Sequence, residues 1–119
     1  LNGKERIMPD KELGKTSIGM KANVAAALSY LLGFVSGIII YLLEKENKFV
    51  RFHAMQSIVT FGLLWLVSVL VWVLPFVGTM LAPLIYMLEV ALWITLIIAA
   101  YQGKYLKLPI AADVAEKMA

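Results

Sequence analysis

The chain has 119 residues, of which 61% are hydrophobic and only 16% are charged, and its formal net charge is +3. A soluble domain is nearer half apolar and a quarter charged, so this composition excludes an ordinary soluble domain and predicts an all-α integral membrane protein. All Lys and Arg lie outside the long apolar runs, which favours contact with lipid headgroups over a nucleic-acid partner, and the absence of cysteine excludes disulfides and thiolate metal ligands.

Residues 1–21 mix charges with glycine and proline and predict a flexible polar tail. Three apolar runs follow, at about residues 22–43, 52–74 and 79–100. At about 1.5 Å per residue, each run is long enough for a hydrocarbon layer of about 30 Å. The sequence therefore predicts a domain of three transmembrane helices within residues 22–103.

The breaks between these runs differ in character. A charged connector, Glu44 to Lys48, separates the first two runs, whereas Pro75, Gly78 and Pro83 mark a hairpin between the second and the third. The last part of the chain, residues 104–119, predicts a short interfacial segment with Ile110, Val114 and Met118 on one face.

Basic residues decide the orientation of such a protein, and here the two sides nearly balance. Three crossings place the N-terminal tail, with five Lys or Arg, on the side of the hairpin turn, which has none. The first connector and the C-terminal tail share the other side and carry six. The positive-inside rule then favours a cytoplasmic first connector and C-terminal tail.

Glu89 carries the one formal charge inside a predicted span. An isolated carboxylate in hydrocarbon is costly, so we expect Glu89 to be neutral, turned inward and hydrogen-bonded to a hydroxyl group. Depth along the helices offers five hydroxyl partners: Ser29, Tyr30, Ser36, Thr60 and Ser68. Two roles remain open, namely helix packing and the handling of a proton, ion or substrate.

A polar stripe runs along the second predicted span. His53, Gln56, Ser57 and Thr60 recur at helical spacing, so they share one side of a helix that we expect to face protein. His53 is the one histidine and has no carboxylate or thiolate at ligand spacing, so no metal or cofactor site is predicted.

Gly33 and Gly37 form a GxxxG spacing in the first predicted span. Such small residues let helices approach closely, either within one chain or between two copies.

The segment from Glu44 to Ser57, EKENKFVRFHAMQS, resembles a family of small prokaryotic membrane proteins, as do AYQGK at 100–104 and the Leu108-Pro109 pair. That family is similar to the Tic-type import component of the chloroplast inner envelope and includes magnetosome membrane proteins. The resemblance implies a multi-pass protein of the cytoplasmic membrane. From their residue types, Phe49 and Phe52 of this segment are expected to anchor at the interface while Arg51 meets headgroups; the alternative is an ordinary loop and helix start.

The residues suggest no enzymatic function, because phosphate loops, Ser-His-Asp sets and paired carboxylates at one depth are missing from the sequence. We expect a membrane scaffold, assembly factor or accessory subunit that packs with itself or with larger membrane subunits. The alternative is one component of an oligomeric translocation, ion or proton channel, since three helices cannot enclose a wide pore alone.

Overall fold

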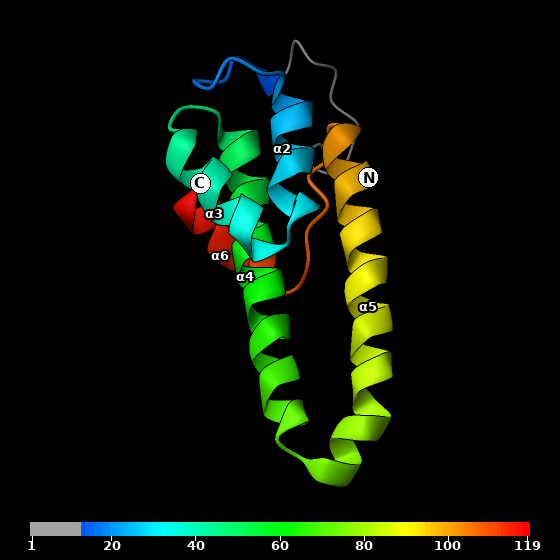
Figure 1. Ribbon diagram of the computed structural model, residues 1–119. Coiled ribbons are helices and arrows are strands. Elements are labelled where there is room, and N and C mark those ends of the chain that lie inside the picture. The colour runs from blue at the N-terminus through cyan, green and yellow to red at the C-terminus, as the bar shows by residue number, and fades with distance from the viewer. Residues whose placement is uncertain (1–12) are drawn as a thin grey trace.

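The computed structural model describes residues 13–119, and every regular element in that range is a helix. The elements are α2 (Ala22–Leu31), α3 (Phe34–Leu43), α4 (Lys48–Trp72), α5 (Pro75–Tyr101) and α6 (Ala111–Met118). Helices α2, α3 and α6 pack with residues 48–61 of α4 and 92–101 of α5, and this part is called the head (Figure 1). Residues 62–91 extend beyond it as a two-helix finger. Residues 1–12 of the predicted tail lie outside the described residues.

Two helices, α4 and α5, are long and apolar enough to cross a membrane by length and composition. The first predicted span is instead two helices of 10 residues each, which run in opposite directions through a turn at Leu32 and Gly33 (Figure 1). Each is about 15 Å long, which is half of the hydrocarbon thickness. The prediction of three membrane-spanning helices is therefore wrong for this part of the chain.

Gly33 makes the reversal possible because its backbone has φ 64° and ψ −137°, a conformation that side chains with a Cβ rarely adopt. Ser36 Oγ stabilises the turn by donating to the Ser29 carbonyl oxygen, at 3.0 Å, and by accepting from the Leu32 N–H, also at 3.0 Å. Ser57 of α4 donates to the Gly33 carbonyl over 2.9 Å. The GxxxG pattern thus does not lie on one continuous helix.

Trp93 of α5 provides hydrogen bonds to the carbonyl groups at the end of α2. Its indole Nε1–H donates to the carbonyl oxygens of Tyr30, at 2.8 Å, and Leu31, at 3.1 Å. Backbone polar groups within a membrane must find partners inside the protein, so these bonds allow a helix to end away from water.

The reversal brings three chain segments to one end of the molecule. Ser17, before α2, bonds to Glu44 after α3, and Asn23 Nδ2 at the start of α2 donates to the Tyr101 carbonyl at the end of α5 over 2.9 Å. The turn between α4 and α5 lies at the opposite end (Figure 1). The expected pairing of the N-terminal tail with the α4–α5 turn is therefore wrong.

Small residues allow the head to pack closely. Ala25 and Ala26 of α2 are fully buried in a core that includes Tyr30 and Leu96. At Gly37 of α3, a Cβ atom would lie 2.9 Å from the Ala54 carbonyl oxygen of α4. Gly37 therefore serves contact within one chain, one of the two roles expected for it.

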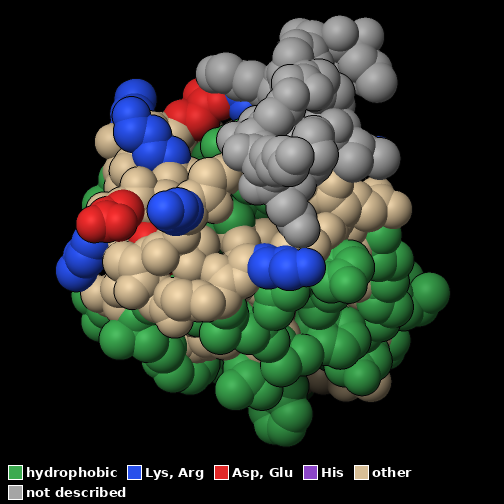
Figure 2. All heavy atoms as spheres, turned by 90° about the horizontal axis from the view of Figure 1, so that it is seen from above, with side chains coloured by type: hydrophobic (Ala, Val, Ile, Leu, Met, Phe, Trp, Pro, Cys, Tyr) green, Lys and Arg blue, Asp and Glu red, His purple; other side chains and the backbone are tan. Residues whose placement is uncertain are grey.

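The finger exposes large apolar side chains. Trp72 is 82% exposed and Phe76 is 87% exposed. At the tip, a Cβ on Gly78 would lie only 2.4 Å from the Val71 carbonyl oxygen, so glycine is required where the two helices meet. Figure 2 views the molecule from the head, where charged side chains lie on the left and centre of this face and hydrophobic side chains cover its lower and right part.

Candidate functional site

His53 lies in α4 and is fully buried in the head. Its Nε2 atom is 2.7 Å from the Lys104 carbonyl oxygen. Because a carbonyl only accepts, Nε2 carries a proton and donates it. Its Nδ1 atom is 2.6 Å from the Tyr30 hydroxyl oxygen and accepts from that hydroxyl in the neutral ring. Both ring nitrogens are therefore occupied, and neither offers a free lone pair to a metal ion.

Gln56 completes the same network one helical turn further along α4. Its Nε2 atom donates to the Tyr30 hydroxyl oxygen over 3.0 Å and to the Leu106 carbonyl over 2.8 Å. Its Oε1 atom accepts from the Leu108 N–H over 3.1 Å. The network of Tyr30, His53 and Gln56 thus fastens α2 and the connector between α5 and α6 to the start of α4.

Aromatic rings surround the histidine. Ring centroids of Phe49 and Phe52 lie 4.6 and 5.3 Å from that of His53, both edge-on, and Tyr105 stacks on it at 6.2 Å. Phe52 is 1% exposed and packs under α6 against Ala112 and Ala115. Phe49 and Phe52 are thus part of the core, so the expectation that they anchor at the membrane interface is wrong.

Glu44 forms a second polar centre, at the end of α3, and its side chain is completely buried. The carboxylate accepts from the Ser17 N–H at 2.9 Å and from the Ser17 hydroxyl at 2.8 Å. The N–H groups of Glu46, at 3.0 Å, and Asn47, at 2.9 Å, donate to the same carboxylate. Burial acts to raise the pKa of Glu44, but these hydrogen bonds outweigh it and lower the pKa to about 2.

Asn47 is the N-cap of α4 and accepts from the Val50 N–H over 3.0 Å. Its Nδ2 atom donates to the carbonyl oxygens of Leu13, at 2.7 Å, and Lys15, at 3.1 Å. Glu44 and Asn47 together hold residues 13–17 against the connector. The described end of the predicted tail is therefore packed.

Arg51 joins the ends of three helices. Its guanidinium donates to the carbonyl oxygens of Glu44, at 2.7 Å, and Tyr41, at 3.2 Å, and its carbon Cζ lies 4.1 Å from the centre of the Tyr41 ring. Nε lies 3.4 Å from the carbonyl oxygen of Ala119. These guanidinium N–H groups of Arg51 therefore bond within the chain and do not make the expected contact with lipid headgroups.

Glu89 lies in the finger, where Ser68 of α4 donates to its Oε1 atom over 3.1 Å. Ser68 is one of the five hydroxyl partners expected from the sequence. The carboxyl group is half-buried at the edge of a groove of about 180 Å³ that Phe61, Tyr86 and Trp93 help to line. Glu89 and the polar centres of the head thus form separate features.

The four residues of the polar stripe are all buried, as their helical spacing predicts. His53, Gln56 and Ser57 bond to other elements, whereas the Thr60 hydroxyl is buried without a hydrogen-bond partner. Glu44, Asn47 and Trp93 were not among the candidate residues predicted from the sequence, and Tyr30 was expected there only as a partner of Glu89. The first two lie inside the segment on which the family resemblance rested, and that position was the one signal for them.

Taken together, a buried polar head and an exposed apolar hairpin define a small helical membrane protein. The chain belongs to the magnetosome magnetite crystal formation protein family, whose family profile matches residues 15–115. This confirms the magnetosome part of the resemblance. Among residues 13–119, no group of three or more His, Cys, Asp or Glu is placed to hold a metal ion.

Archaeal relatives share most of the chain. A UPF0132 membrane protein of Methanocaldococcus jannaschii is 47% identical over 105 residues, which cover 88% of this chain and 94% of the relative. A UPF0132 membrane protein of Archaeoglobus fulgidus is 44% identical over 98 residues, which cover 82% of this chain and 95% of the relative. No solved structure matches the chain.

Proposed function

We propose that the chain is a non-catalytic membrane module that crosses the cytoplasmic membrane twice and acts as a scaffold or accessory subunit. Helices α4 and α5 supply the two crossings along their full length, and α2 and α3 enter the membrane halfway and return. The head then occupies the half of the membrane on one side, and its polar connectors lie at the surface of that side. Because, within residues 13–119, the finger is the only part that reaches the other side, this range presents its polar surfaces to one compartment.

The main observation behind this proposal concerns the polar side chains of residues 44–57, the segment on which the family resemblance rested. Glu44, Asn47, Arg51, His53 and Gln56 direct their hydrogen-bonding atoms to groups of the same chain. A catalytic group must instead keep an atom free to meet a substrate. This pattern supports a structural role for the segment, while the exposed apolar faces of the finger are left to contact lipid or other membrane proteins.

The revised topology also supports a cytoplasmic head. No Lys or Arg occurs between residues 52 and 103, so every basic residue of the described range belongs to the head or its connectors. The sequence alone had suggested five Lys or Arg on one side and six on the other. That near balance arose because the N-terminal tail was placed on the side of the α4–α5 turn. With both tails and the α3–α4 connector on one side, the positive-inside rule gives a clear preference.

Extraction under mild conditions tests the scaffold role. The tagged chain is solubilised in a mild detergent from the membranes of its own host, and the intact particles are weighed by native mass spectrometry. A scaffold or accessory subunit is expected as a particle of fixed stoichiometry, either with itself or with a larger membrane subunit. Recovery of single chains that carry lipid only, across several mild detergents, would contradict the proposal.

A further inference from the structure

The two halves of the molecule differ in the number of helices that they contain. The head half holds α2 and α3 beside α4 and α5, with α6 at its edge, whereas the finger half holds α4 and α5 alone (Figure 1). The boundary between the halves is the α2–α3 turn, where a Cβ on Gly33 would lie 3.8 Å from Phe61 of α4. From Phe61 to Trp72, α4 continues for about 17 Å, roughly half of the hydrocarbon layer.

The difference in the number of helices corresponds to a difference in the membrane area that the two halves occupy. A helix with its side chains is about 10 to 12 Å across, so it occupies about 80 to 110 Å² of a membrane plane. Two additional helices therefore make the head half larger than the finger half by about 160 to 220 Å². The overall extents of 51 × 30 × 22 Å agree with an elongated body that is broad enough for the head bundle.

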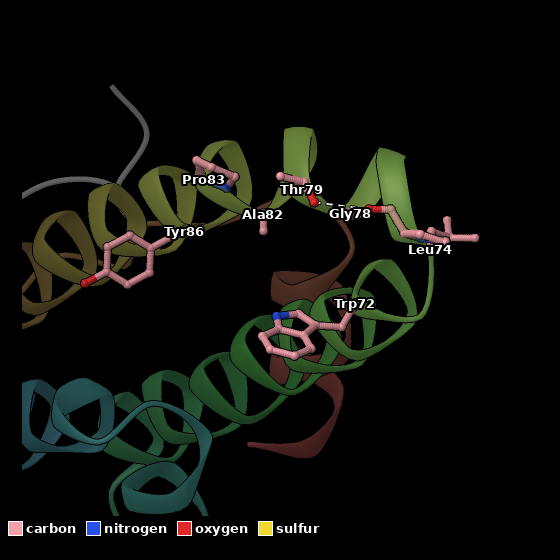
Figure 3. A pocket seen from close by; sticks show the side chains of 8 residues that line it. Trp72, Leu74, Gly78, Thr79, Ala82, Pro83 and Tyr86 are labelled. Atoms are coloured by element: carbon pink, nitrogen blue, oxygen red, sulfur yellow. Dashed lines mark hydrogen bonds between the residues drawn. The ribbon is translucent and has the colours of Figure 1, made fainter.

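The finger half is also incompletely filled near its tip. A groove of about 590 Å³ lies between the two helices there, lined by residues that include Trp72, Thr79, Pro83 and Tyr86. Figure 3 shows Trp72 and Tyr86 on opposite arms of the hairpin, both beside this space. No charged side chain lines the groove, so acyl chains of the surrounding lipid are its fitting occupant.

We propose that the chain is a wedge whose lipid partner is a curved bilayer, with the head on the convex side. The inference rests on the proposed two-crossing arrangement. In a membrane that bulges toward the head, the head-side leaflet is stretched and the opposite leaflet is compressed. The broad half then fills area where lipids are spread apart, and the narrow half takes little area where they are crowded. A flat bilayer matches this shape less well.

A membrane tube drawn outward from a giant vesicle tests the inference, because its outer leaflet is the convex one. The chain has no cysteine, so Lys45→Cys on the exposed α3–α4 connector gives a single site for a fluorescent label. The protein is reconstituted into phosphatidylcholine vesicles, which carry no net charge, so electrostatic attraction does not sort it. An impermeant quencher then separates chains with the head outside from chains with the head inside.

The two orientations are matched controls for each other, since they share sequence, label and lipid. Chains with the head outside should have a tube-to-flat density ratio above unity, and chains with the head inside a ratio below unity. Equal ratios, or the reverse order, would overturn the wedge. A second single-cysteine variant, Val77→Cys at the tip, checks insertion. If its label lies on the same side as that of Lys45→Cys, the two-crossing arrangement itself fails, and the wedge fails with it.

Discussion

The Glu44 carboxylate accepts hydrogen bonds from both the backbone N–H and the hydroxyl of Ser17, over 2.9 and 2.8 Å. These residues lie on either side of the segment that the sequence predicted to cross the membrane once. Their contact requires that the segment return to the side from which it started. The same bond that stabilises the connector therefore defines the topology of the chain.

Acid should weaken this contact. The pKa of Glu44 is lowered from 4.5 to about 2 in the folded chain. Its contribution to stability, about 3 kcal/mol, is therefore present above pH 4.5 and is lost as the pH falls toward 2. Thermal unfolding in detergent micelles across this range measures the loss. In Glu44→Gln the loss should be much reduced, whereas Glu46→Gln, an exposed neighbour, should behave like the parent chain; an unchanged pH profile in Glu44→Gln would contradict the assignment.

The single histidine should be a neutral ring protonated on Nε2. The Lys104 carbonyl can only accept, and Tyr30 can then donate to Nδ1. Nitrogen NMR of histidine-labelled protein near neutral pH reads the tautomer without ambiguity, because the chain has one histidine. Tyr30→Phe is the matched variant and should shift the Nδ1 signal. A proton on Nδ1 alone would leave Nε2 facing the Lys104 carbonyl without a donor and would overturn the described network, and a doubly protonated ring would contradict donation from Tyr30 to Nδ1.

Three glycines should respond differently to alanine. Gly33→Ala is expected to destabilise the protein, by about 1 to 2 kcal/mol, because Gly33 has a positive φ of 64°. Gly37→Ala should also destabilise it, since the new Cβ would meet the Ala54 carbonyl. Gly62 lies within α4 with open space around its Cβ position, so Gly62→Ala should be neutral or stabilising by up to about 1 kcal/mol. Equal effects at all three positions, measured by unfolding in micelles, would refute the turn at Gly33.

Glu89 and Ser68 should act as a packing pair. Glu89→Gln keeps an acceptor for the Ser68 hydroxyl and should leave stability nearly unchanged, whereas Glu89→Leu should cost about 0.6 to 2 kcal/mol. Ser68→Ala in combination with each variant completes a double-mutant cycle. A proton or ion pathway predicts the opposite pattern, in which Glu89→Gln is stably folded but abolishes function in the host.

The sequence predicted the membrane class, the hairpin at Pro75 and the buried face of α4, because those features follow from apolar length, proline and helical spacing. It failed at residues 22–43, where length alone suggested one crossing. The reversal at Gly33 depends on Ser57 and Trp93, which are far away in the sequence and satisfy the carbonyl groups of the turn. Local patterns carry no information on such long-range bonds.

Glu44 and Asn47 were missed for a related reason. In the sequence they belong to a charged run, and such runs are usually solvated. In the folded chain Ser17 covers Glu44, and Asn47 donates to the backbone of Leu13. Their burial depends on where the N-terminal segment lies, which only the topology of α2 and α3 determines.

The most direct test of the two-crossing topology is the side of the membrane on which residue 15 lies. Single cysteines replace Lys15, Lys45, Val77 and Gln102 in turn in the cysteine-free chain, and an impermeant thiol reagent is applied to sealed vesicles of one orientation. If the chain reverses at Gly33, Lys15→Cys, Lys45→Cys and Gln102→Cys are labelled from one side and Val77→Cys from the other. Labelling of Lys15→Cys from the same side as Val77→Cys would mean that residues 22–43 cross the membrane, and would rule out the two-crossing topology.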